Sequence, residues 1–403
     1  MLKRLFTYMF VVVLSTMACH AQKKEIAQAK SDIKAGKSLV EAEASMRKLL
    51  ADSANRYNEK IWLVLFDAVK KQYEAVNEQM YLKQSSDTSK LFDLAHRMFG
   101  TLEGLDSIDA EPDDEGRVKL KYRHKHSEYL NAYRKNLYNG GLFFMSKQDY
   151  AHAYIMFDSY VDCARQPLFS DFDYASKDAL LPKAAFYAVY NAFKSGNGDA
   201  ILRHDSLARK DAAHLLLTLQ CVAETYRLRG DTIHYVATLI EGFNRQPLSK
   251  YFFPHLFGVR FKSGDVKGAL NLCDRALAHD STDIVTLLAK STACLALERY
   301  DECVALCDHI IAADEALADA YLNAGLAYFN QAVHIEKQTK HTREQRKLMA
   351  TLYQKAMPYM QTYRKLAPTR SDLWAMPLYT IYLNLNMGKE FEEMDAIMKQ
   401  RTK

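Results

Sequence analysis

The chain has 403 residues, of which 49% are hydrophobic, with only 15 glycines and 8 prolines. This composition indicates a packed globular protein and excludes a disordered one. The formal net charge of +5 falls to +3 without Lys3 and Arg4, and this value is too small to indicate a nucleic-acid-binding protein.

Residues 1–21 have the pattern of a secretory signal peptide. Two basic residues precede an apolar run over 5–14, which is too short to anchor the chain in a membrane. Small residues follow, so we expect cleavage after Ala21 and a mature, exported chain that begins at Gln22. The alternative is a lipid anchor at Cys19, where the sequence resembles a bacterial lipoprotein motif without its usual leucine. The expected location is the periplasm or the outer membrane, and no later apolar run reaches membrane-spanning length.

Residues 22–135 show helical periodicity without a fixed register. Gly36 marks a turn, after which Ala42 and Met46 begin an apolar stripe with helical spacing. A further helical pattern covers residues 55–105. We therefore expect N-terminal helical repeats of irregular register over 22–135.

Residues 136–249 contain a clearer stripe, which starts after a turn at Asp149 and passes through Ala153 and Phe157. The next comparable position is Ile201. The interval from Ala153 to Ile201 is fourteen residues longer than the 34-residue period that the second half of the chain shows. We expect this excess to form a loop insertion near 164–182. The unit at Ile201 should be irregular, because Asp205 falls on one of its apolar positions.

The second half of the chain has a 34-residue period. Tyr235, Ala269 and Cys303 follow one another at this spacing, and each is followed by small or apolar residues four and seven positions later. A turn precedes each stripe, as at Gly230 and Gly264. This spacing predicts a helix, a short turn and a second helix in every period.

The period and its residues resemble the tetratricopeptide repeat (TPR) family. In the unit that starts at Ala318, Tyr321, Gly325 and Tyr328 occupy the family's fourth, eighth and eleventh positions. Gly141 occupies the eighth position of the unit before Asp149. The resemblance implies an all-α fold, a TPR-like α-solenoid of antiparallel helix pairs in a right-handed superhelix.

The resemblance divides the mature chain into the irregular repeats of 22–135, TPR-like repeats over 136–249 and C-terminal TPR repeats over 250–403. The last segment has an extra polar stretch, for which we expect an extended helical hairpin near 331–355. The junction at Ala21 together with the repeats resembles exported proteins of Bacteroidetes-type bacteria.

Six cysteines remain after signal cleavage, at positions 163, 221, 273, 294, 303 and 307. A metal site or redox pair around Cys303 and Cys307, with His309 as a further ligand, is one interpretation. However, Cys273, Cys303 and Cys307 occupy positions where the repeat needs small apolar side chains, and no CxxC pair occurs. We therefore expect these cysteines to be small, buried core residues.

Charged residues cluster over 106–126, where an acidic run is followed by a basic run. We expect a solvated loop whose acidic part faces the N-terminus of the next helix. The alternative is a patch that binds a partner. A calcium loop is not expected, because the glycine at its sixth position is missing.

In TPR proteins the first helix of each unit lines a ligand-binding groove. The resemblance implies that this groove is lined here by Tyr251, Phe261, Lys262, Leu288, Thr292, Leu322, Leu326, Phe329 and Asn330. Family members that bind a peptide carboxylate present Lys, Arg and Asn there, whereas this chain presents mainly Leu and Phe. We therefore expect an apolar or helical peptide or protein partner. The alternative is that these side chains only pack against neighbouring helices.

No HExxH, GxSxG, GxGxxG or Walker motif occurs, so we expect a non-catalytic protein without cofactor or metal. The resemblance implies an exported scaffold that binds a protein or peptide. One alternative is a carbohydrate-capture protein of outer-membrane nutrient uptake, which would need more tryptophan than Trp62 and Trp374. Another is an enzyme with an unrecognised helical active site, which would need clustered acids beyond 106–115.

Overall fold

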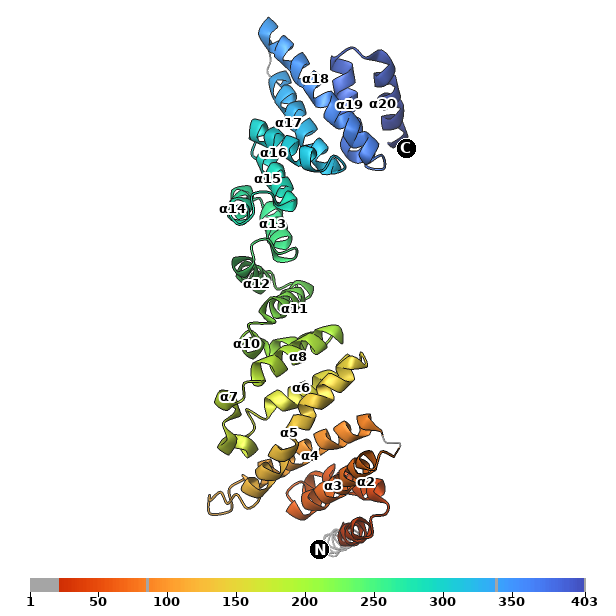
Figure 1. The fold of residues 1–403 in the computed structure, drawn as a ribbon, viewed down its shortest axis with the longest axis vertical. Coiled ribbons are helices and arrows are strands. Elements are labelled where there is room, and N and C mark those ends of the chain that lie inside the picture. Colours follow the sequence, from red (N-terminus) through yellow and green to blue (C-terminus); the bar gives the residue numbers. More distant parts are fainter. Residues whose placement is uncertain (1–21, 85–86, 338–339, 402–403) are drawn as a thin grey trace, which may run out of the picture. The chain divides into compact units, whose positions relative to one another are not determined.

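The computed structural model describes residues 22–84, 87–337 and 340–401 (Figure 1). The expected signal peptide and Cys19 lie outside these ranges. Over the described residues every regular element is an α-helix or a 3-10 helix, and no strand occurs. The expectation of an all-α fold is therefore confirmed. None of the described helices is both long and apolar enough to cross a membrane.

The chain divides into two compact units, one up to Thr225 and one from Tyr226. The first unit contains a helix over residues 22–35, then α2 (Leu39–Leu50), η1 (Ser53–Asn55), α3 (Glu59–Tyr81), α4 (Thr88–Asp109), α5 (Arg123–Ser146), α6 (Tyr150–Asp162), η2 (Pro167–Phe172), α7 (Tyr174–Lys177), α8 (Leu181–Lys194), α9 (Gly198–Arg203) and α10 (Asp205–Ala208). Helix α11 (Leu215–Leu228) contains the boundary. The second unit contains α12 (Thr232–Arg245), α13 (Phe252–Lys262), α14 (Val266–Leu277), α15 (Ile284–Ala296), α16 (Tyr300–Ala313), α17 (Ala318–Glu336), α18 (Arg343–Leu366), α19 (Ser371–Asn384) and α20 (Gly388–Arg401).

Within each unit a helix packs mainly on the helix that precedes it and the helix that follows it (Figure 1). In the second unit the first helices of successive pairs also touch, as α15 touches α17 and α17 touches α19. Short turns join antiparallel neighbours, so each pair buries its apolar stripe against the next pair. This arrangement is the expected TPR-like α-solenoid.

The turns between paired helices recur with the predicted 34-residue period. Gly196, Gly230, Gly264 and Glu298 follow one another at this spacing, and all four have positive φ, between 59° and 83°. Positive φ favours glycine, because a side chain crowds the backbone there. The next residue is the N-cap of the second helix, and Asp231 and Asp265 accept a backbone N–H with their carboxylates. The turn at Gly196 therefore keeps the 34-residue period in the irregular unit of Ile201 as well.

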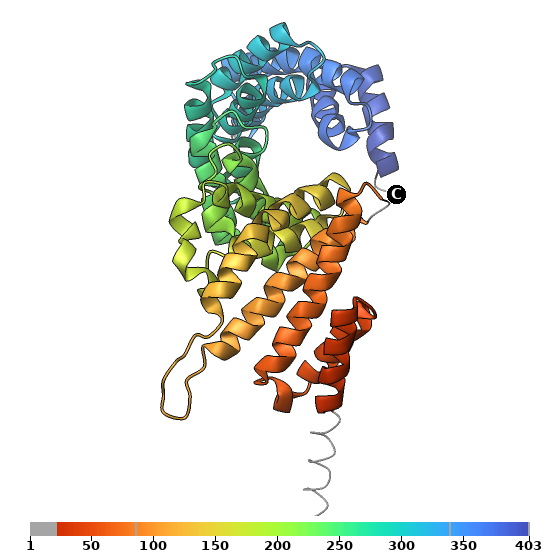
Figure 2. The same ribbon diagram turned by 60° about the horizontal axis from the view of Figure 1, so that its bottom comes forward.

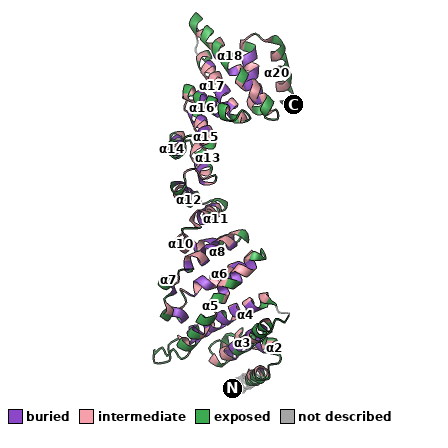
Figure 3. Ribbon diagram, in the orientation of Figure 1, coloured by how far each residue is buried: buried purple, intermediate pink, exposed green. Residues whose placement is uncertain are grey.

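The predicted stripe is the core of the second unit. Tyr235, Ala269 and Cys303 are 7%, 0% and 0% exposed, and they lie at the same level of α12, α14 and α16. The residues four and seven positions later are also buried. Buried positions face the neighbouring helices along both units (Figure 3). The 34-residue register is thus confirmed.

Two glycines at the eighth position of their units allow close contact between helices. A Cβ atom on Gly141 would lie 2.6 Å from the ring of Phe157, and one on Gly325 would lie 2.6 Å from the sulfur of Met360. Because real Cβ atoms do not approach other heavy atoms so closely, a larger residue at either position would force the side chain of Phe157 or Met360 to move.

The expected insertion folds back onto the first unit instead of forming an open loop. Residues 167–177 form the short helices η2 and α7, and Leu168, Phe169 and Tyr174 are buried. Phe169 contacts the rings of Phe99 and Tyr174. The aromatic side chains of this segment therefore anchor it to the helices beneath it.

The unit near Ile201 is irregular, as expected. Its second helix breaks at His204, where α9 ends and α10 begins. His204 is fully buried, and its Nε2 atom lies 2.6 Å from the carboxylate of Asp158 on α6. Asp205 pairs with Arg209 rather than entering the core.

The expected segment boundaries fall at different kinds of places. The boundary at 135/136 lies inside α5, and the one at 249/250 lies in the turn between α12 and α13.

The expected hairpin near 331–355 consists of the end of α17 and the start of α18. These helices have 19 and 24 residues, whereas α13–α16 have 11–14. Thr342 starts α18 with a capping box to Gln345, and α18 continues through Pro358.

The expectation for residues 106–126 is wrong in one respect. Asp106 and Asp109 are not solvated but buried in the last turn of α4. Asp106 binds Arg123 through two hydrogen bonds of 2.8 Å, and Asp109 accepts the backbone N–H of Tyr122. Carboxylates do face the N-terminus of α5, as expected, while residues 111–121 are exposed (Figure 2).

Glu103 on α4 predicts a pH dependence of stability. Burial, together with the charges of Asp162 and Asp106, raises its pKa to about 7. The folded chain therefore holds this proton more tightly than the unfolded chain does, so the contribution of Glu103 to stability falls as pH rises from about 4.5 to about 7. We expect Glu103→Gln to raise the thermal midpoint of the first unit by several degrees at about pH 8, with little change at about pH 4. An equal shift at both pH values would contradict this explanation.

Candidate partner-binding surface

The predicted groove residues lie on α13, α15 and α17 or directly before α13. Tyr251 precedes α13 and contacts the ring of His255 at 4.3 Å. Phe261 lies 5.6 Å from Phe257 in a stacked arrangement, and Lys262 at the end of α13 is exposed. We refer to the surface of α13, α15 and α17 that carries the nine predicted groove residues and Val285 as the first-helix face.

Most apolar members of the first-helix face are only half-buried. Leu288 on α15 packs against the core formed by α14–α17, and Leu326 and Phe329 on α17 pack against the core formed by α17–α20. Leu322 is buried in that second core. Val285, one turn before Leu288, is 57% exposed. Most apolar side chains of the first-helix face are therefore covered by the core on one side and exposed to solvent on the other.

A buried polar network supports the centre of this face. The side-chain amide of Asn323 donates to Ser291 Oγ at 2.9 Å and to Thr292 Oγ1 at 3.0 Å. Thr292 in turn donates to the carbonyl of Leu288. Because all of these atoms lie between α15 and α17, the network fixes how the two first helices align.

Asn330 lines a hollow that the sequence did not predict. The long ends of α17 and α18 extend past the turn at Glu298 and leave two adjoining hollows of about 280 and 330 Å³. The first is lined by Glu298, Tyr300, Asn330, Val333, His334 and Lys337. In the second, Ile335, Leu348 and Leu352 give an apolar wall, and Leu348 is 50% exposed. The length of the hairpin was the only sequence signal for this site.

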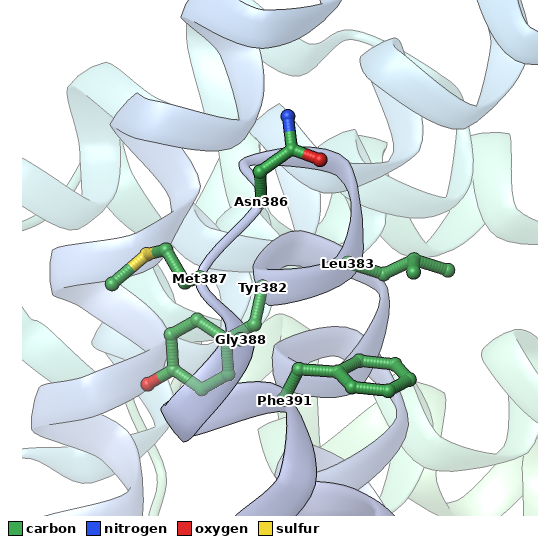
Figure 4. A pocket seen from close by; sticks show the side chains of 6 residues that line it. All are labelled: Tyr382, Leu383, Asn386, Met387, Gly388 and Phe391. Atoms are coloured by element: carbon green, nitrogen blue, oxygen red, sulfur yellow. The ribbon is translucent and has the colours of Figure 1, made fainter.

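A smaller hollow of about 230 Å³ lies at the turn between α19 and α20 (Figure 4). Its labelled side chains are Tyr382, Leu383, Asn386, Met387, Gly388 and Phe391. The ring of Phe391 lies 4.7 Å from that of Tyr379. Apolar and aromatic side chains form most of its walls, so the hollow suits an apolar contact.

All six cysteines of the described chain are unpaired and buried, as expected from their positions in the repeat. Burial raises the pKa of Cys221 and Cys273 to about 12 and that of Cys294 to about 11. Cys303 shares a hydrogen bond with Cys307, and this bond together with burial raises the Cys303 pKa further. Over the described ranges no group of three His, Cys, Asp or Glu side chains is placed to hold a metal ion.

Burial should make these thiols unreactive in the folded chain, including Cys307, whose pKa is lowered by the hydrogen bond from Cys303. At about pH 8 a thiol with a pKa near 11 has roughly a hundredfold less thiolate than an ordinary one. We expect Ellman's reagent to label none of the six in the folded chain 22–403, and all six after unfolding in guanidinium. Rapid labelling of any cysteine under native conditions would contradict the burial assigned to it.

No protein-family model matches the chain, and no curated protein does. Similar solved structures include a tetratricopeptide repeat protein from Parabacteroides merdae, at 13% identity and a TM-score of 0.36, over 63% of this chain and 97% of that one. The C-terminal part of a TPR repeat-containing protein from Cytophaga hutchinsonii has 12% identity and a TM-score of 0.42, over 63% and 91%. The TPR domain of P58(IPK) has 11% identity and a TM-score of 0.26, over 94% and 99%.

The helix pairs of this chain have the TPR fold. Its paired helices, positive-φ turns and buried stripe all recur with the 34-residue period of that fold.

Proposed function

We propose that this chain is an exported, non-catalytic scaffold that binds a protein or peptide partner on the first-helix face of its second unit. The observation that supports it is the run of partly exposed apolar side chains on α13, α15 and α17, with Val285 the most exposed among them. A helical or extended peptide can cover such a surface with side chains spaced one helical turn apart.

Photo-crosslinking tests this proposal directly. Benzoylphenylalanine at Val285 should yield a discrete adduct when the chain is produced in its native cell. The same probe at Lys267, an exposed residue on the second helix α14, serves as the matched control. Adducts that are equal at both positions, or absent at Val285, would reject the first-helix face as the binding surface.

Export has its own test, which is the chemical nature of the N-terminus. Cleavage after Ala21 should give a mature chain that begins at Gln22 and carries no lipid. Intact-mass measurement of the chain purified from its native cell decides this. A diacylglyceryl group on Cys19 would establish the lipid-anchored alternative instead.

The packing does not favour the carbohydrate-capture alternative, because Trp374 is buried and the partly exposed ring of Trp62 already packs on its neighbours. The indole of Trp62 donates to the carbonyl of Arg56 and packs on Gly104. Trp374 is buried, and the guanidinium of Arg364 lies 5.0 Å from its ring.

A further inference from the structure

The first unit has a hollow of about 310 Å³ between α5 and the folded insertion. Asn131, Arg134 and Lys135 line it from α5, and Phe172, Lys177 and Leu180 line it from the insertion and the start of α8. Its volume suits a small organic molecule. The hollow lies outside the second unit, so an inference about it does not depend on the proposed function.

Asp178 carries the one carboxylate among the residues that line this hollow, and both of its oxygens already accept hydrogen bonds. Asp178 Oδ2 accepts from the guanidinium of Arg134 at 2.7 Å and from the hydroxyl of Tyr160 at 2.8 Å. Its Oδ1 accepts the backbone N–H of Leu180 at 2.9 Å. Asp178 therefore has little capacity left to bind a cation or a hydrogen-bond donor from a ligand.

The guanidinium of Arg134 is also enclosed. It lies 3.8 Å from the ring centres of both Tyr160 and Tyr174, and it donates to the carbonyl of Tyr160. Arg134 and Asp178 thus neutralise each other and fix the wall of the hollow. They leave its binding chemistry to the remaining side chains.

The remaining polar side chains of the hollow, those of Lys135, Lys177 and Asn131, offer hydrogen-bond donors. Lys135 and Lys177 are exposed, and neither forms an ion pair with any residue that the structure describes. Asn131 uses its oxygen to accept the hydroxyl of Tyr174 at 2.6 Å, which leaves its amide N–H groups for a ligand. Two positive charges and an amide donor face the hollow, and its carboxylate is already neutralised by Arg134, so an anion is the complementary ligand.

The rest of the lining is apolar and aromatic. Phe172 is stacked on Tyr174, with ring centres 5.4 Å apart and planes 9° apart. Leu180 is 44% exposed at the rim. An anion without an apolar part would leave these apolar side chains exposed to water, whereas a ligand with a ring or a branched chain would cover them.

We propose that this hollow binds a small carboxylate with an aromatic or branched apolar group. The carboxylate would lie between Lys135 and Lys177, and the apolar group would contact Phe172 and Leu180. Such a carboxylate belongs either to a free organic acid or to the C-terminus of a peptide.

Titration of the chain 22–403 with phenylacetate, followed by calorimetry or ligand-observed NMR, tests the proposal. We expect a dissociation constant of about 1 mM, as is reasonable for a ligand of this size. Phenethylammonium, which has the same ring and the opposite charge, should bind at least about tenfold more weakly. Equal binding of the two probes would overturn the proposal.

Variants locate the site. The double variant Lys135→Gln/Lys177→Gln should weaken phenylacetate binding about tenfold, and Leu180→Glu should weaken it similarly by placing a like charge at the rim. Lys48→Gln/Lys90→Gln changes two exposed lysines of the same unit and should leave binding unchanged. Undiminished binding to the first double variant would also overturn the proposal.

Two peptide probes distinguish the sources of the carboxylate. A tetrapeptide that ends in phenylalanine should bind through this hollow if a peptide C-terminus is the natural ligand, and its C-terminal amide should not. If phenylacetate binds and neither peptide does, the site takes a free acid. Neither result depends on crosslinking at Val285, so this proposal and the proposed function can fail separately.

Discussion

Replacing Asp178 with alanine should destabilise the first unit by about 3–5 kcal/mol. The side chain of Arg134 is only 7% exposed, and Asp178 is its only carboxylate partner among the described residues. Burial opposes ionisation of Asp178, but hydrogen bonds from Tyr160 and Arg134 outweigh it and hold its pKa below the usual range. Without Asp178, a buried guanidinium would keep its charge and lose its counterion.

Guanidinium unfolding measures this effect, with Trp62 fluorescence as the reporter in a Trp374→Phe background. Asp171→Ala, an exposed change in the same insertion, is the control and should cost less than about 0.5 kcal/mol. Adding Arg134→Met to Asp178→Ala should restore much of the loss, because the unpaired charge is then gone. An unchanged unfolding midpoint for Asp178→Ala would show that the pair does not hold the insertion.

Replacing Ala269 with arginine should have an effect of similar size in the second unit. Ala269 is completely buried on α14 at the centre of the 34-residue stripe. A long charged side chain there would separate the helices and bury an unpaired charge, which together cost several kcal/mol. We expect at least about 4 kcal/mol or loss of cooperative unfolding, followed by Trp374 fluorescence in a Trp62→Phe background.

The matched control for this variant is Asn271→Arg, two residues further along the same helix and exposed. It adds the same charge to an exposed position of the same helix and adds no buried volume, so its effect should stay below about 0.5 kcal/mol. If Ala269→Arg were as stable as this control, the 34-residue register would be wrong.

The binding surfaces were less predictable than the fold. The first-helix positions could be assigned from the resemblance, but their exposure could not. Leu288 is half-buried while Leu322, at the equivalent position 34 residues later, is buried. Leu322 belongs to the core that α17 forms with α18, α19 and α20, and sequence spacing does not say how closely the next helices pack on each turn. The hollow beside Lys135 and Lys177 was not predicted, because its walls are far apart in sequence.

The helix pairs, the turns and the buried stripe, including the burial of Cys303 and Cys307, could be predicted without the structure. These features follow from local rules: helical spacing places residues i, i+4 and i+7 on one side, and a tight turn needs a positive φ. The places where charged residues are buried became visible only in the folded chain. Asp106 pairs with Arg123 across 17 residues and Asp178 pairs with Arg134 across 44. A charge can be buried only beside its partner, and the folded chain alone brings such partners together.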